Sequence, residues 1–447
     1  MQNEISIVMP IGNTVQYLFD TLQSIKHQTF EAFEVICIDD ATNDGSSEIL
    51  EEIAKSDSRF KVVRLEKKQG AGRCRNQGFS LAKAPFVIFL DADDLFEKDL
   101  LEHMYKKIKE TSADIVLVEY EYFDKSIEGN VAGVPLYKTN IYNSPFIIEE
   151  LSDYCFIKKW RFNPWNKLYN RDFLVEKRID FQDIEAANDV YFSTMSAILA
   201  NKIVCVDTTR PLVHYRINTT SQTSSRRTPM HSYYAFKYVQ EELIKRGLWS
   251  QYSQKVSLLF LNSILGELQK CVNEKKGRDA YEFLQKEGIK ALEADSLTEY
   301  EEIINQFKTK SFDDKWLTKD VMLKRELYQQ SGRMNELIEL LKKSKCALWG
   351  GGAYTRAFLE FINDKYDSLS LKIIDNNEKK QGSEILGFKI YSPQEIIEDV
   401  DLIIITNKYY FPAIYTQVCS YNESKEFFLL YAFLEMDISI NDCIIRS

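Results

Sequence analysis

Short apolar segments alternate with amphipathic ones over the first 90 residues, and this alternation restricts the fold more than any other feature. The apolar segments are rich in Val, Ile and Phe, which favour strands, and they lie at Ile5–Met9, Phe33–Ile38, Phe60–Leu65 and Phe86–Leu90. The segments between them space their apolar residues as helices do, at Val15–His27, Ser47–Lys55 and Arg75–Ala82. Apolar strands separated by helices predict an α/β fold with a doubly wound, mainly parallel sheet covered on both faces.

Proline spacing divides the rest of the chain. Seven of the nine prolines lie in the first 229 residues, and none lies between Pro229 and Pro393. The proline-free stretch carries five candidate helices, at Ser232–Lys245, Ser253–Val272, Ala280–Leu292, Glu299–Lys308 and Met334–Lys343. From Cys346 onward, strand and helix patterns alternate again. We therefore expect three domains: an α/β domain over 1–228, a helical region over 229–344 and a smaller α/β domain over 345–447.

Composition and charge exclude several classes of protein. The 57 basic and 67 acidic residues give a net charge of −10, which argues against a nucleic-acid binder with a broadly basic surface. The eight cysteines include no Cys-x-x-Cys pair, so we expect neither a disulfide framework nor a structural zinc site. No apolar run approaches the roughly 20 residues that span a bilayer, and no leader pattern is visible. The sequence therefore predicts a soluble cytoplasmic protein with reduced cysteines.

Carboxylates follow two of the predicted strands. Asp39 and Asp40 follow the second strand, and Asp91, Asp93 and Asp94 follow the fourth. The carboxyl ends of parallel strands share one edge of the sheet, where ligands bind. Taken singly, Asp39, Asp44 and Asp93 are typical helix caps or turn residues, and Asp44, ahead of Ser46 and Ser47, fits the start of a helix. Taken together they would repel one another, and a divalent cation such as Mg²⁺ or Mn²⁺ that also binds phosphates would relieve the repulsion.

Arg75 lies in the small-residue segment Gly70–Gly78, which leads into a helix. Helix N-termini and arginine side chains both suit phosphate oxygens. The alternative is a solvated arginine on the first helical turn. A metal, a diphosphate and an arginine together outline a nucleotide-sugar site.

Four segments in this order resemble the family 2 glycosyltransferases with the GT-A fold: Pro10–Asn13, Asp39–Asp44, Cys74–Gly78 and Asp91–Asp94. The resemblance implies a donor site, with the following assignments: Pro10 on the donor side, Asp40 on the nucleotide base, Arg75 on the base or diphosphate, Asp91 on the ribose and Asp93 on the metal. Gly12 stands where the family commonly has a tyrosine against the base, which leaves the choice of donor open.

The resemblance continues to about residue 225. It implies that Trp165 and Asn166 line the acceptor side and that Asp189 is the general base, with Asn188 in place of the family's glutamate. It further implies a lid over the donor phosphates, formed by His214, Arg216 and Ser221. For His214, a packed histidine and a second metal or phosphate contact are equally consistent with the sequence.

The function implied is a metal-dependent, inverting transfer of a sugar, from a UDP donor to a hydroxyl of a glycan or lipid-linked glycan in surface polysaccharide synthesis.

Lysine-rich segments at Glu274–Arg278 and Lys342–Lys345 are typical of solvated helix ends. Alternatively, they form a basic patch that faces anionic lipid at the inner face of the membrane or a lipid-linked diphosphate acceptor.

The C-terminal segment resembles a small Rossmann-like domain, with glycines from Gly350 and an acid at Asp375. A structural or oligomerising role, a bound nucleotide or sugar, and a redox cofactor all remain open for it. Two alternatives to the transferase therefore stand: a bifunctional enzyme with a second redox or group-transfer step in this domain, and a non-catalytic assembly protein with a degenerate transferase fold.

Overall fold

The computed structural model describes residues 2–123, 145–150, 160, 162–208, 210–216, 228–271, 275–297, 301–312, 331–350, 355–356, 358–360, 362, 371–405, 426–429 and 444–446. Contacts between these residues divide them into two compact units, one ending at Lys308 and the other beginning at Thr309. The boundaries of the three expected domains stay a prediction.

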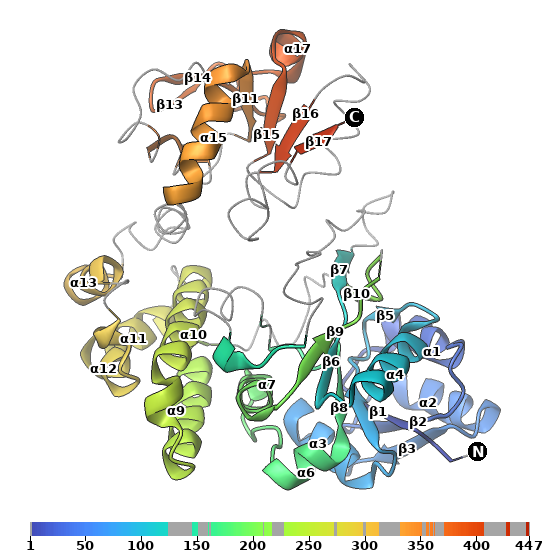
Figure 1. Ribbon diagram of the computed structural model, residues 1–447. Helices are drawn as coiled ribbons and strands as arrows, with labels where there is room; N and C mark the ends of the chain where they lie inside the picture. The colour runs from blue at the N-terminus through green and yellow to red at the C-terminus, as the bar shows by residue number, and fades with distance from the viewer. Residues whose placement is uncertain are drawn as a thin grey trace. The chain divides into compact units, whose positions relative to one another are not determined.

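The first unit is built on a mixed seven-stranded sheet in the order β3-β2-β1-β4-β8-β6-β9 (Figure 1). Four strands are mutually parallel: β1 (Ile5–Ile11), β2 (Phe33–Asp39), β3 (Phe60–Arg64) and β4 (Phe86–Phe89). β8 (Lys167–Asn170) runs antiparallel to both its neighbours, whereas β6 (Ile115–Leu117) and β9 (Ile203–Cys205) are parallel to each other. The predicted α/β fold class is confirmed.

The helices of this unit include α1 (Val15–Lys26), α2 (Ser46–Ser56), α3 (Ala71–Leu81), α4 (Leu100–Thr111), α6 (Arg171–Lys177) and α7 (Asn188–Leu199). Helix α3 begins four residues earlier than predicted, because the amide of Cys74 already donates to the carbonyl of Gly70. A Cβ on Gly78 would lie 2.4 Å from a methyl of Val8, so α3 packs directly on β1. This close packing fixes the helix against the centre of the sheet.

A second, three-stranded sheet has the order β5-β10-β7, formed by β5 (Leu95–Phe96), β10 (Val213–Arg216) and β7 (Tyr120–Phe123). Strand β10 is antiparallel to β5 and parallel to β7. Because β5 follows β4 closely along the chain, this sheet brings residues beyond 210 back to the loop that carries Asp91 and Asp93.

Helices dominate the rest of the first unit: α9 (Pro229–Lys245), α10 (Trp249–Lys270), α11 (Lys275–Phe283), α12 (Ile289–Ala291) and α13 (Glu301–Thr309). The helix predicted over 280–292 is interrupted, because a π-helical turn at Leu284–Gly288 separates α11 from α12. Helix α9 packs against α7 and α10. Among the described helices, none is both long enough and apolar enough to cross a bilayer.

The second unit contains a seven-stranded sheet in the order β13-β14-β12-β11-β15-β16-β17. Its strands are β11 (Cys346–Trp349), β12 (Leu371–Ile374), β13 (Glu384–Ile385), β14 (Phe388–Tyr391), β15 (Leu402–Ile405), β16 (Glu426–Leu429) and β17 (Ile444–Arg446). The five central strands are parallel and the two edge pairs antiparallel. Helices α15 (Ser331–Lys343) and α17 (Pro393–Ile396) belong to this unit. A smaller α/β sheet domain is thus confirmed.

A buried carboxylate ties β2 to its surroundings. Glu34 is 2% exposed and accepts hydrogen bonds from the Ser6 hydroxyl at 2.7 Å, the Lys61 ammonium at 2.6 Å and the Lys83 amide at 3.3 Å. Burial alone would raise the pKa of Glu34, but these bonds together lower it below its usual value. A carboxylate whose pKa is lower in the folded state than in the unfolded state stabilises the fold. This contribution is complete at a pH above the unfolded-state pKa and is lost as the pH falls through the folded-state pKa.

We expect Glu34→Ala to lower the free energy of unfolding of the first unit by about 2 kcal/mol at neutral pH, because the Ser6 hydroxyl and the Lys83 amide lose a buried, charged acceptor, whereas the exposed Lys61 is resolvated by water. The difference from wild type should shrink as the pH falls below the unfolded pKa of 4.5. Urea denaturation followed by circular dichroism measures both effects. The exposed Glu31→Ala serves as the control and should change stability by less than about 0.5 kcal/mol. Equal effects of the two variants at neutral pH would contradict the assignment.

Candidate nucleotide-sugar site

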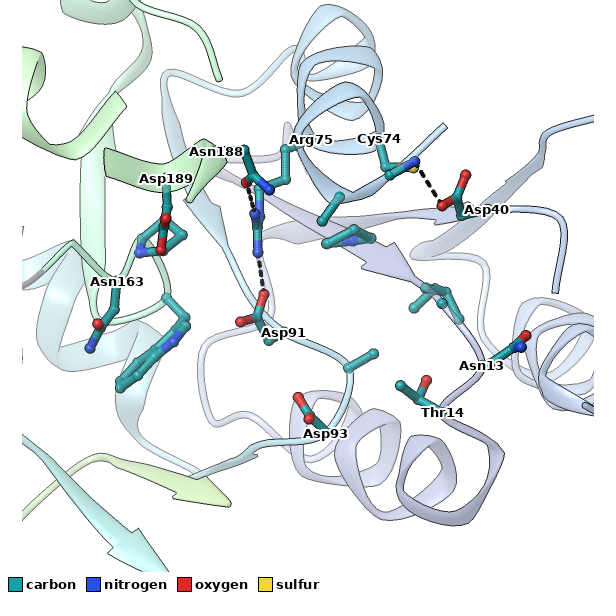
Figure 2. Close-up of a pocket in the computed structure, with 18 of the residues that line it drawn as sticks. Asn13, Thr14, Asp40, Cys74, Arg75, Asp91, Asp93, Asn163, Asn188 and Asp189 are labelled. Atoms are coloured by element: carbon teal, nitrogen blue, oxygen red, sulfur yellow. Dashed lines mark hydrogen bonds and ion pairs between the residues drawn. The ribbon is translucent and has the colours of Figure 1, made fainter. Parts of the chain in front are cut away.

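A cavity of about 640 Å³ opens at the carboxyl ends of β1 and β4 and at the start of α7 (Figure 2). Its volume lies in the range typical of small-molecule sites. Its lining includes these residues predicted as site residues: Pro10, Asp40, Arg75, Asp91, Asp93, Trp165 and Asp189. The residues predicted for the donor site and the predicted general base, Asp189, therefore line the same cavity.

The loop after β4 places two carboxylates on the cavity wall and buries a third. Burial and the neighbouring charge of Asp91 raise the pKa of Asp93 to about 6. Asp94 is fully buried, and one of its oxygens accepts a hydrogen bond from the Arg216 amide at 2.9 Å. Burial, followed by the charges of Asp93 and Asp91, raises the pKa of Asp94 well above its usual value. Asp94 thus anchors the loop to β10, while Asp91 and Asp93 face the cavity.

The residues present fit a divalent cation only as a partial ligand set. Within the described parts of the chain, no group of three or more His, Cys, Asp or Glu side chains is arranged to hold a metal ion. Asp93, however, is a hard oxygen ligand in a crowded acidic loop, where a cation would relieve the repulsion from Asp91. Mg²⁺ and Mn²⁺ commonly take one or two carboxylates and complete their coordination with substrate phosphates and water. The chemistry of the loop therefore suits a cation that arrives with a diphosphate.

Asp40 is oriented by the loop that precedes α3. Its carboxylate accepts hydrogen bonds from the amides of Gln69 at 2.6 Å and Gly70 at 2.9 Å, and it also lies against the Cys74 thiol (Figure 2). Burial and the charge of Asp40 raise the pKa of Cys74 to about 12, so this thiol stays protonated. The contacts hold Asp40 in place at the cavity wall, and its predicted contact with a nucleotide base stays a prediction.

Arg75 is not solvated: it is 6% exposed. Its guanidinium donates to a carboxylate oxygen of Asp91 at 2.7 Å and to the side-chain carbonyl of Asn188 at 2.9 Å. It also lies over the ring of Phe181, 5.2 Å from the centroid. The alternative of a solvated arginine is therefore wrong, and Arg75 links the β4 loop to the start of α7.

Asp189 occupies the first turn of α7 and is half-buried. Figure 2 shows it on the side of the cavity where Asn163 lies, with Asp93 on another side. A carboxylate in this position can accept a proton from a hydroxyl group held in the cavity.

Aromatic residues form the wall near the predicted acceptor side. Trp165 is 4% exposed and stacks on Tyr215, with ring centroids 5.2 Å apart. It also forms a T-shaped pair with Tyr120, with ring centroids 4.6 Å apart. Asn166 does not line the cavity. Its amide donates to the Val118 carbonyl at 3.0 Å and its side-chain oxygen accepts from Lys167. Its predicted acceptor role is thus not favoured by its contacts.

Arg216 and His214, both on β10, differ in their contacts: Arg216 contacts the β4 loop, whereas His214 contacts two glutamates. The Nε of Arg216 donates to the Asp93 carbonyl at 2.8 Å, and its guanidinium lies 4.6 Å from the ring centroid of Tyr17. The ring nitrogens of His214 contact Glu121 at 2.6 Å and Glu97 at 3.0 Å, and the hydrogen bond with Glu121 is the main cause of its raised pKa. A metal at His214 would have to displace one of these carboxylates. Ser221 lies outside the described residues.

Some lining residues carry no sequence signal that we recognised, among them Tyr17, Asn163 and Tyr215. Tyr17 could have been inferred from its place on the first turn of α1, because that helix follows β1 and starts at the same edge of the sheet. Asn163 and Tyr215 are each one or two residues from a predicted site residue. Only the fold shows that they reach the same cavity.

Residues 6–176 match the model of the family described as glycosyl transferase family 2, and residues 342–426 match the one described as C2185-like, N-terminal. The glycosyltransferase GlyG of Streptococcus pneumoniae is 31% identical over 216 residues, 46% of this chain and 69% of that protein. A poly(ribitol-phosphate) β-glucosyltransferase of Bacillus spizizenii is 31% identical over 207 residues, 45% of this chain and 31% of that protein. The chain spans about two thirds or less of the length of these curated relatives.

Among solved structures, residues 1–349 of TarS from S. aureus in complex with UDP-GlcNAc superpose with a TM-score of 0.57 at 22% identity, covering 74% of this chain and 92% of that one. This similarity shows the fold, which is GT-A. The matches to the family model and to GlyG show the class: the chain belongs to glycosyl transferase family 2.

Proposed function

We propose that the chain is a metal-dependent, inverting glycosyltransferase that takes its sugar from a uridine diphosphate donor. The acceptor is a hydroxyl group of a glycan or lipid-linked glycan in surface polysaccharide synthesis. The observation that carries this proposal is the shared cavity: Asp91 and Asp93 from the β4 loop line it together with Asp189 from α7. A donor site and a base in one cavity are what direct transfer to a bound hydroxyl requires.

In this mechanism Asp189 accepts the proton of the acceptor hydroxyl as that oxygen bonds to the anomeric carbon. The bond from the anomeric carbon to the diphosphate breaks on the opposite face of the sugar, and the diphosphate leaves with its electron pair. Attack from the face opposite the leaving group inverts the configuration. The half-buried position of Asp189 in the wall of the cavity supports this role.

Asp93 would hold the Mg²⁺ or Mn²⁺ ion, with Asp91 beside it on the ribose side of the donor. A bound divalent cation supplies electrostatic stabilisation of the charge that develops on the departing diphosphate. Arg216 supports the same loop from β10, because its Nε donates to the Asp93 carbonyl. For His214, whose ring nitrogens already contact two glutamates, we propose a packing role in place of a metal role.

The uridine donor is supported by the UDP-GlcNAc complex of TarS, which shares the fold. The acceptor class is supported by the name of the poly(ribitol-phosphate) β-glucosyltransferase and by the resemblance described above. The location of the protein stays a prediction: in the cytoplasm, or at the inner face of the membrane through the lysine-rich segments.

For the second unit we propose a Rossmann-like domain with a structural or oligomerising role. Gly350 follows β11 with φ of 112°, as a tight turn after a parallel strand requires. The acid at the end of β12 is engaged by its own loop: Asp375 accepts from the Asn377 amide at 2.8 Å and pairs with Lys380 at 3.0 Å. A ribose would have to compete with both partners, which disfavours the bifunctional alternative.

Gly12 offers a test of where the base lies. A Cβ placed on Gly12 would meet nothing within 4 Å, so the cavity has room for a larger side chain there. We expect Gly12→Tyr to bind UDP at least about fivefold more tightly, because stacking on a base contributes about 1–3 kcal/mol and 1.4 kcal/mol is a tenfold change in affinity. Isothermal titration calorimetry measures the change, and Gly12→Ala should stay within twofold of wild type. Unchanged or weaker binding by Gly12→Tyr would place the base elsewhere.

The proposed function is tested by the release of nucleoside diphosphate from a panel of UDP-, GDP- and TDP-sugars, with Mn²⁺ and with EDTA. The proposal expects release from a UDP-sugar with Mn²⁺ when a polyol-phosphate or glycan acceptor is present. Release unaffected by EDTA would refute the metal role. Turnover of only GDP- or TDP-sugars would refute the uridine donor.

A further inference from the structure

Helix α7 has no cap of its own. Its N-cap residue is Ala187, which has no side-chain acceptor and lies in the left-handed region with φ of 61°. Both features disfavour the start of a helix. The first turn of α7 carries Asp189, so contacts from elsewhere must hold this turn in place.

Helix α3 supplies part of these contacts, through the chain segment that precedes α7. The Asn76 side chain donates to the Phe181 carbonyl and accepts from the Phe181 amide, both at 2.8 Å. At Gly72 the two backbones touch, because a Cβ there would lie 2.4 Å from the Gln182 carbonyl and 3.1 Å from the Cβ of Asn188. The segment from Phe181 to Asn188 is thus fastened at both ends.

Arg75 completes the connection. Its planar guanidinium holds two partners at a fixed angle, Asn188 on one side and Asp91 on the other (Figure 2). Below it, the ring of Phe181 stacks on Phe192 of α7 with centroids 4.0 Å apart. One buried side chain therefore links the donor loop after β4 to the turn that presents Asp189.

We infer that Arg75 and Asn188 are positioning residues, which hold Asp189 at a fixed place relative to the donor loop. This inference rests on the proposed function, in which Asp189 is the base. Asn188 meets Arg75 with a neutral carbonyl oxygen, so the Arg75–Asn188 contact is a hydrogen bond and the guanidinium's only ion pair in this link is with Asp91. A displacement of about 1 Å at a catalytic group is enough to lower the rate about 100-fold.

The test replaces Asn188 with leucine, which has a similar size and no acceptor. We expect kcat, corrected for the fraction of protein that binds UDP, to fall about 30- to 100-fold, while the KM for the donor stays within twofold. Asn188→Asp restores an acceptor for Arg75 and should lie within about fivefold of wild type. Asn188→Ala replaces the leucine variant if that one fails to fold.

The matched control is Asp183→Asn. It removes an exposed ion pair with Arg73, which likewise joins α3 to the segment that precedes α7. Exposed ion pairs contribute little, so its kcat should stay within twofold. Hydrogen exchange in Asn188–Phe192 gives a readout that needs no activity: we expect amides there to exchange at least about tenfold faster in Asn188→Leu and unchanged in Asp183→Asn.

Wild-type kcat in Asn188→Leu, a change confined to the donor KM, or unchanged exchange in Asn188–Phe192 would each overturn the inference. Failure of the proposed function looks different. An active Asp189→Asn would remove the proposed base, and the exchange rates alone would then decide whether Asn188 holds this turn.

Discussion

Asp189→Asn should lower kcat about 1,000-fold while leaving the affinity for UDP within twofold of wild type. The amide cannot accept the proton of the acceptor hydroxyl, and general-base assistance typically contributes about 10²–10⁴-fold. The change is nearly isosteric, and Asp189 is half-buried at the cavity wall, so the fold should be preserved. Steady-state transfer assays and UDP titration on the same preparation separate the two effects.

The exposed Asp183→Asn is the control, because it removes a carboxylate six residues earlier in the chain whose partner is Arg73. It should retain transfer within twofold. Transfer by Asp189→Asn at more than a tenth of the wild-type rate would show that another group accepts the proton.

Asp93→Asn should lower transfer about 100- to 1,000-fold through weaker binding and weaker stabilisation of the departing diphosphate. Asp93 lies on the cavity wall beside Asp91, and burial and that neighbour already disfavour its charged form in the absence of a cation. We therefore expect UDP affinity in saturating Mn²⁺ to fall at least about tenfold in this variant, which loses one charged metal ligand. Chelation with EDTA should bring wild type to a similar affinity.

Asp189→Asn is the natural comparison for this binding experiment, since it should respond to Mn²⁺ as wild type does. If wild type binds UDP equally well with Mn²⁺ and with EDTA, the assignment of Asp93 to a cation is wrong. Loss of UDP binding in both variants would instead indicate a general disturbance of the cavity.

The main strands and helices around the site could be predicted because their physical signals are local. β1, β2 and β4 are short, strongly apolar segments, and their carboxyl ends share an edge in any parallel arrangement. The sequence predicts the start of α3 four residues too late, because the glycines Gly70 and Gly72 are typical of a loop. In the structure the helical bonds already begin at Gly70.

The roles of individual aspartates could not be predicted from their type. Asp39 accepts from the Thr42 amide at 2.9 Å and the Ser47 hydroxyl at 2.6 Å, so it is a turn and helix-start residue. Asp44 accepts from the amides of Val15 and Ser46, as a capping residue does. Of the three aspartates in the β4 loop, Asp91 and Asp93 line the cavity and Asp94 is buried behind them. These different roles depend on contacts that sequence spacing does not specify.

Arg75 illustrates the same limit over a longer range. Its position in a small-residue segment indicated an anion site, but its partner Asn188 is 113 residues away. Sequence spacing carries no information about such a pair without the fold. The link between the donor loop and α7 therefore appears only in three dimensions.

Hydrogen exchange of the full chain with and without UDP and Mn²⁺ tests the central claim most directly, because it locates the nucleotide in the molecule. We predict protection of the segments that line the cavity, at 10–17, 68–75 and 91–93, with no change in β12 and β15 of the second unit. Protection confined to the second unit, or no protection in the cavity segments at UDP concentrations that saturate binding, would contradict a nucleotide-sugar site at the end of β1 and β4.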